Sequence, residues 1–254
     1  MTLAVDMSSW GGPITSAKVE SLWQAGARRA IVGVSDVELA RQQLTLTAER
    51  GMEIQAYSYM YWGANNEERL DRVRRAAQGL PLAFVWPDFE DKNAPLDDPA
   101  GVISWMRGCM ALAERLGLPV GVYTAAWWWR SWARNTAAFA HYPLWVAQYD
   151  EWPVLTMTPF GGWTECAMKQ YKGTTVLGSK PNDYSVDLNF YLGGGPMPEE
   201  VVDEKARRAA AQDAFRQHIA GLFLSGDPAL ADRVYWELQY VRLCAGLPIV
   251  QPPQ

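Results

Sequence analysis

LAFVWPDFED, residues 82–91, is a short apolar run with three acidic residues among its last four positions. A buried β-strand has this pattern. In an extended backbone Asp88 and Glu90, at positions i and i+2, point to the same face. In parallel β/α barrels the carboxyl ends of the strands form the mouth that holds the active site. The stretch therefore predicts a barrel strand that presents two carboxylates at such a mouth.

Two carboxylates held close together repel each other when both are ionised, so the pKa of one of them rises. A carboxyl group that stays protonated near neutral pH can act as a general acid. On an arbitrary loop, an Asp-x-Glu pattern is usually a solvated acidic turn. At the end of an apolar strand among aromatic residues, Asp88 and Glu90 are predicted to be catalytic.

Similar apolar runs recur along the chain and alternate with segments of helical spacing. Ser16 is a plausible N-cap of the first helix, and Gly51, Gly79 and Gly117 follow the next three helices, where glycine commonly ends a helix. The predicted strands are 3–5, 30–34, 54–59, 82–89, 120–123 and 144–148, and the predicted helices are 18–25, 37–50, 67–78 and 99–116. This rhythm predicts an α/β protein with a closed or nearly closed (β/α) barrel of the TIM type.

Two changes of pattern divide the remainder of the chain. Between Tyr149 and Asn189 the sequence changes to short strands and turns, so the last strands are expected to be irregular and partly antiparallel. Beyond a Gly-Gly-Gly-Pro segment, residues 199–224 and 228–243 have the spacing of two amphipathic helices. We expect a barrel domain, residues 1–194, and a helical C-terminal extension, residues 195–254. The extension is expected to dock on the barrel, to pair protomers, or to attach the protein to a cell wall or a virion.

The composition excludes several classes of function. A net charge of -5 and a pI near 5.2 argue against nucleic acid as a partner, because phosphate-backbone binders carry basic patches. No run is long and apolar enough to cross a membrane, and the N-terminus lacks the pattern of a signal peptide. Three cysteines without CxxC spacing and two histidines form no recognisable metal framework, so no metal is expected and the cysteines are interpreted as buried thiols. No glycine-rich nucleotide motif follows a strand, and we expect no cofactor.

Aromatic residues are unusually frequent, with 13 Trp and 11 Tyr. Large aromatic side chains can fill a core or an interface. They can also line a carbohydrate cleft, since the C–H faces of sugars stack on aromatic rings. Both interpretations remain open for the clusters at residues 57–62, 127–129 and 145–152.

Two further acids belong to the first and last predicted strands. Asp6 ends the first strand, and Asp187 lies near the last. Each alone is most simply a helix cap or a turn residue. Because first and last strands are neighbours in a closed barrel, Asp6 and Asp187 are predicted to converge with Asp88 and Glu90 on one mouth.

The chain resembles the family 25 glycoside hydrolases, the Chalaropsis-type lysozymes, among which are phage endolysins and virion-associated lysozymes. The resemblance covers about residues 3–192 in the correct order. It rests on Val5-Asp6-Met7-Ser8-Ser9-Trp10 for the opening DVSxWQ motif, Asp88-Phe89-Glu90 for DxE, Gly121-Val122-Tyr123-Thr124 for the YT strand, Pro143-Leu144-Trp145-Val146-Ala147-Gln148-Tyr149 for PLWVAxY, Gln170-Tyr171 for QY, and Val186-Asp187-Leu188-Asn189 for VDxN.

The resemblance implies cleavage of the β-1,4 bond between N-acetylmuramic acid and N-acetylglucosamine in peptidoglycan. It implies that Glu90 is the general acid, that Asp88 assists the attack of the substrate's N-acetyl group, and that Asp6 and Asp187 tune the site. The residues implied to bind substrate are Tyr57, Tyr59, Tyr123, Trp145, Tyr149 and Gln170. The protein would act on the bacterial cell wall, after synthesis in the cytoplasm and release by lysis or a holin, or on a virion.

Two departures from the family pattern predict an altered cleft floor. Val32-Gly33-Val34-Ser35-Asp36 stands where the family usually has a Thr-Glu-Gly type segment, and Ser58 replaces a His between Tyr57 and Tyr59. They favour two alternatives: a non-catalytic glycan-binding protein of the wall or virion, and a hydrolase of chitin-like or other N-acetylated glycans. Retention of the four acids favours an enzyme, because a binder has no need of acids that repel one another.

Overall fold

The computed structural model describes residues 2–8, 11–151, 153–177 and 185–191. The predicted C-terminal extension, residues 195–254, and Cys244 lie outside the described residues. Within the described ranges, no helix is long and apolar enough to cross a membrane.

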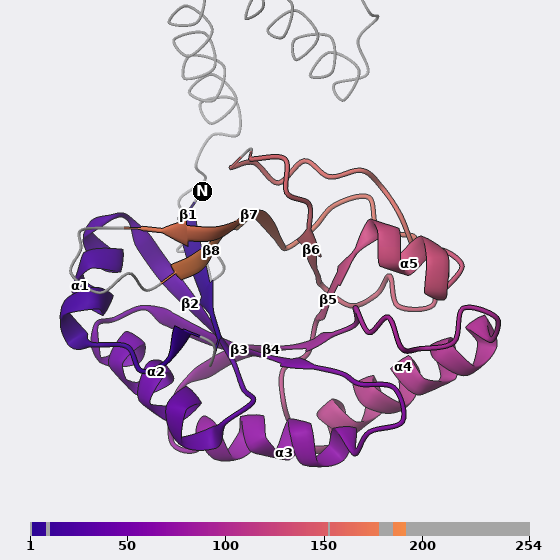
Figure 1. Cartoon of the computed structure of the whole chain (residues 1–254), viewed down its shortest axis with the longest axis horizontal. Coiled ribbons are helices and arrows are strands. Elements are labelled where there is room, and N and C mark those ends of the chain that lie inside the picture. Colours follow the sequence, from indigo (N-terminus) through magenta and orange to yellow (C-terminus); the bar gives the residue numbers. More distant parts are fainter. Residues whose placement is uncertain (1, 9–10, 152, 178–184, 192–254) are drawn as a thin grey trace, which may run out of the picture. The chain divides into compact units, whose positions relative to one another are not determined.

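The described residues form a closed eight-stranded barrel in sequence order (Figure 1), which confirms the predicted fold class. Its strands are β1 Thr2–Met7, β2 Ala27–Gly33, β3 Glu53–Tyr59, β4 Leu82–Asp88, β5 Val122–Ala125, β6 Leu144–Ala147, β7 Met168–Val176 and β8 Ser185–Tyr191. Strands β1 to β7 pair in parallel. β8 runs antiparallel to both β1 and β7, as expected from the change of pattern after Tyr149.

Helices cover the outside of the first five strands in Figure 1. They are α1 Ser16–Gln24, α2 Val37–Glu49, α3 Asn66–Ala76, α4 Pro99–Arg115 and α5 Ala126–Trp132. The cap of α1 is Thr15 rather than the predicted Ser16, because the Thr15 hydroxyl accepts from Lys18 N at 3.2 Å. Asp36 and Asp98 cap α2 and α4 in the same way.

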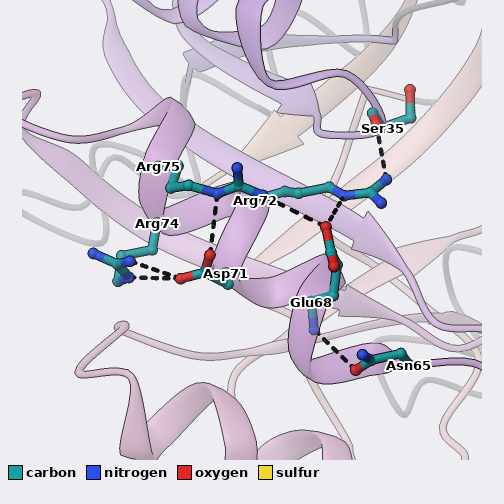
Figure 2. Close-up of polar contacts among 7 residues, drawn as sticks. All are labelled: Ser35, Asn65, Glu68, Asp71, Arg72, Arg74 and Arg75. Carbon is teal, nitrogen blue, oxygen red and sulfur yellow. Dashed lines mark hydrogen bonds and ion pairs between the residues drawn. The ribbon is translucent and has the colours of Figure 1, made fainter.

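Salt bridges cover the exposed face of α3 (Figure 2). Glu68 accepts from Arg72 at 3.1 Å, and Asp71 accepts from Arg74 at 2.7 Å. Arg72 also donates to the carbonyl of Ser35 in the β2–α2 loop at 3.3 Å. Exposed pairs of this kind each contribute about 0–1 kcal/mol, so this face adds little to the stability of the fold.

Two apolar layers explain why the strand sequences are apolar on both faces. Val85 and residues of the same parity pack outward against the helices. Trp86 and Trp145 meet inside the barrel with ring centroids 5.9 Å apart. A side chain at Gly121 would begin 2.3 Å from the Trp86 ring, so this glycine makes room for the indole. The barrel interior is therefore a packed aromatic core that forms the floor beneath the mouth.

The Trp127-Trp128-Trp129 cluster is a helix that the sequence did not predict. Trp128 and Trp129 are fully buried in α5, whereas Trp127 is 49% exposed. Trp128 Nε1 donates to Asp91 O at 3.1 Å. Two of the three indoles thus fill the core, and only Trp127 is available to a ligand.

Candidate active site

The four predicted acids lie at one end of the barrel interior. Asp88 ends β4 and Glu90 follows it, while Asp6 lies in the second half of β1. Asp187 is paired with Asp6 in the β1–β8 register. Because β8 is antiparallel, its first half reaches the end where the parallel strands terminate. The direction of the last strand therefore brings Asp187 to the mouth.

Gln170 on β7 links two of these acids through its side-chain amide. Its Nε2 donates to Asp6 Oδ2 and to Asp187 Oδ2, both at 2.9 Å. Its Oε1 accepts from the hydroxyls of Tyr123 at 2.7 Å and Tyr149 at 2.8 Å. Both N–H donors and both acceptor positions of the amide are therefore used. Because carboxylates can only accept, the side that faces Asp6 and Asp187 must carry the NH₂ group. Gln170, which is 3% exposed, thus organises the site, and its contact with substrate stays a prediction.

Asn189 is a site residue that the sequence analysis quoted within a motif but did not assign. Its Nδ2 donates to Asp6 Oδ2 at 2.6 Å, and its Oδ1 accepts from Trp145 Nε1 at 2.7 Å. The signal that could have found it is strand alternation, which places Asn189 on the same face as Asp187. Asn189 joins the acid cluster to the aromatic floor.

The carboxyl groups of Asp6 and Asp187 both have raised pKa values. Burial, followed by the negative charge of Asp187, raises the pKa of Asp6 to about 7, although the amides of Asn189 and Gln170 oppose this. Burial also raises the pKa of Asp187, against a hydrogen bond from the backbone N–H of Thr174. Burial thus favours the protonated form of both groups.

Asp88 and Glu90 differ in what surrounds them. Burial, and then the charges of Glu90 and Asp6, raise the pKa of Asp88 well above its usual range. Among the described residues, the buried Oδ1 of Asp88 has no hydrogen-bond partner. Burial raises the pKa of Glu90 to about 7, and the nearby Lys92 ammonium lowers it. The site thus combines an unsatisfied buried carboxyl oxygen with an acid that is half protonated near pH 7.

The predicted sugar-lining aromatic residues divide into exposed and buried groups. Tyr57 and Tyr59 are half-buried, and Tyr149 is 60% exposed, so all three can reach a ligand at the mouth. Trp145 is 1% exposed and lies against the Tyr123 ring, with centroids 4.3 Å apart. Trp145 and the buried Tyr123 support the site from beneath, because other side chains cover their faces, and their contact with substrate stays a prediction.

Of the two departures from the family pattern, one faces the helices and the other faces the barrel interior. Ser58 pairs with Pro87 and has the parity of Ile54, so it faces the helices and is buried there. Gly33 does face the interior, where a Cβ would lie 2.6 Å from the ring of Tyr57. Glycine at this position allows Tyr57 to lie close against β2.

The acids are not arranged as metal ligands. Within the part of the chain that the structure describes, no group of three or more His, Cys, Asp or Glu side chains could hold a metal ion. Cys109 and Cys166 are buried free thiols, and burial raises the pKa of each to about 12 and about 11.

Comparison with known proteins gives consistent matches. Counting factor 50 of Dictyostelium discoideum is 34% identical over 121 residues, which are 46% of this chain and 39% of that protein. Probable GH family 25 lysozyme 3 of the same organism is 32% identical over 120 residues, 46% of this chain and 24% of that protein. The chain thus matches well under half the length of these relatives.

The fold is also similar to a solved structure. The muramidase from Acremonium alcalophilum superposes with a TM-score of 0.60 at 18% identity, over 77% of this chain and 95% of that chain. The family described as Glycosyl hydrolases family 25 matches residues 5–179, which is more than half of the sequence. The barrel, its acidic mouth and this match together show that the chain belongs to glycosyl hydrolase family 25.

Proposed function

We propose that this protein is a peptidoglycan-degrading glycoside hydrolase that cleaves the β-1,4 bond between N-acetylmuramic acid and N-acetylglucosamine. The observation that carries the proposal is the group of four acids at one barrel mouth, of which Asp88 is buried with an unpartnered oxygen. Membership of the family supports the reaction class, and the exposed aromatic rings beside the acids suit a glycan.

In the proposed reaction, Glu90 donates its proton to the glycosidic oxygen as the bond to the anomeric carbon breaks. A pKa of about 7 suits this role, because a general acid works best when its pKa lies near the operating pH. The carbonyl oxygen of the substrate's own acetamido group attacks the anomeric carbon and forms a cyclic oxazolinium ion. Water then opens this ring, and the Glu90 carboxylate takes up the proton from that water.

Asp88 is proposed to bind the acetamido group during the attack. Its unpartnered Oδ1 can accept a hydrogen bond from the acetamido N–H, which orients the carbonyl oxygen and stabilises the positive charge on the ring. Asp6 and Asp187 act through the protein, since their negative charges and the amide of Gln170 determine how protons are distributed in the site.

The test is the clearing of purified peptidoglycan by the wild-type protein, Glu90→Gln and Glu49→Gln. Glu49 is an exposed acid in the last turn of α2, at the opposite end of the barrel, and serves as the matched control. We expect clearing by the wild type and Glu49→Gln, release of fragments with muramic acid at the reducing end, and loss of at least about 100-fold in rate in Glu90→Gln.

Other outcomes would contradict the proposal in different ways. Fragments with N-acetylglucosamine at the reducing end would mean that a different bond is cleaved. Absence of clearing on walls of several chemotypes, with glycan binding retained by both the wild type and Glu90→Gln, would indicate a glycan-binding protein. Cleavage of chitin oligomers alone would indicate a different N-acetylated substrate.

A further inference from the structure

The loop after β4 and the start of α5 bring a cation and an exposed indole together beside Glu90. Lys92 follows the end of β4 by four residues, and Trp127 is the second residue of α5, directly after β5. β4 and β5 are paired neighbours, so both residues lie at the mouth. The Lys92 Nζ is 5.2 Å from the centroid of the Trp127 ring. Lys92 is exposed, and no carboxylate among the described residues forms an ion pair with it.

The backbone that carries this pair is held by hydrogen bonds to neighbouring segments. Asp91 directly precedes Lys92, and its carboxylate accepts from Trp62 N in the segment after β3 at 2.7 Å and from Asn93 N at 3.0 Å. Trp132 of α5 donates from Nε1 to Ala94 O at 2.8 Å. These bonds connect the loop to α5, so the backbone positions of Lys92 and Trp127 are held next to each other.

The acids at the mouth indicate what Lys92 and Trp127 could bind. The mouth carries four acids, and each of them that is ionised repels a carboxylate on the substrate. Lys92 is close enough to Glu90 to lower its pKa, so an incoming carboxylate would meet a cation beside the general acid. The exposed face of Trp127 adds apolar contact for a sugar ring or an alkyl group at the same place.

We propose that Lys92 and Trp127 form a subsite for the peptide stem of muramic acid, with Lys92 binding a stem carboxylate and Trp127 packing against the neighbouring atoms. This inference rests on the proposed function, because it names the substituent that the substrate carries at this site. It makes the protein selective for glycan strands that bear peptide stems over strands from which the stems have been removed.

The test compares kcat/KM on soluble glycan strands with stems and on the same strands after amidase treatment. In Lys92→Met the side-chain length is kept and the charge is lost. We expect the ratio of the two kcat/KM values to fall by about 3- to 10-fold, mainly through KM on the stem-bearing strands. Lys92→Arg should restore most of it. Arg115→Met removes an exposed cation from the last turn of α4, at the opposite end of the barrel, and should leave the ratio unchanged.

A binding measurement separates this inference from the proposed function. In a Glu90→Gln background, the affinity for a stem-bearing disaccharide should fall by a similar factor when Lys92→Met is added, whether or not the wild type hydrolyses peptidoglycan. An unchanged ratio and an unchanged affinity in Lys92→Met would overturn the subsite. A fall in affinity that is equal for stem-bearing and stem-free fragments would also overturn it, because Lys92 would then contact the sugar.

Discussion

The clearest test of the electrostatic structure is the replacement of Asp6 by Asn. Asp6 is fully enclosed, and two opposing effects act on its carboxylate. Burial and the charge of Asp187 favour the protonated form, whereas the amides of Gln170 and Asn189 favour the ionised form. The structure indicates that burial and charge win, with a pKa near 7.

The magnitude follows from linkage between protonation and folding. In the unfolded chain the group ionises near pH 3.8, and in the folded chain near pH 7. Folding then binds a proton between these values, so the contribution of Asp6 to stability is complete below about pH 4 and is lost as the pH rises to about 7. The full displacement corresponds to a loss on the order of 4 kcal/mol, part of which is shared with Asp187 and Asp88.

Urea unfolding of the wild type and Asp6→Asn at pH 4, 5.5, 7 and 8 measures this effect. At pH 4 both side chains are neutral and the two free energies of unfolding should agree within about 1 kcal/mol. By pH 8 the variant should be more stable than the wild type by about 2–4 kcal/mol. Equal destabilisation of the variant at every pH would refute the reasoning, because it would mean that the amides keep Asp6 ionised throughout.

Three further predictions concern single positions. Lys92→Met removes a positive charge beside Glu90, so the pKa of Glu90 should rise and the alkaline limb of the kcat/KM profile should move up by a few tenths of a pH unit. A downward movement would contradict the assignment of Glu90 as the protonated acid. Gly121→Ala forces a methyl group against Trp86 and should lower the free energy of urea unfolding by about 1–3 kcal/mol. An unchanged midpoint would show that the indole moves freely. Thr174 has a φ of 50°, which is unfavourable for a β-branched residue. Thr174→Gly should therefore raise the melting temperature, with a gain of about 0.5–1 kcal/mol after the greater chain entropy of glycine is included, and a lower melting temperature would refute this.

Most of the barrel was predictable because its signals are local. Strand β4 was predicted over 82–89 and is observed over 82–88, and α4 was predicted over 99–116 and is observed over 99–115. Helix α5 was missed because three consecutive Trp residues show no amphipathic spacing. Its helical state depends on burial of Trp128 and Trp129 against segments distant in the sequence.

The site was predicted in part for the same reason. Asp88 and Glu90 point to the same face because they are two residues apart in an extended backbone. The proximity of Asp6 and Asp187 follows from closure of the barrel. The burial of Trp145 and Gln170 was not predicted, because exposure depends on what covers a side chain. A sequence pattern does not show which distant residues will bury a given side chain.

The sequence by itself determined the barrel, the end at which the acids lie and the family. These follow from strand alternation and from ordered motifs, which can be read from a few neighbouring residues. Only the tertiary structure decided that Gln170 joins Asp6 to Asp187, and that Lys92 lies over Trp127. Those contacts join residues up to 164 positions apart, and their energies depend on burial and on distance. Both quantities exist only after the strands have closed around a common core.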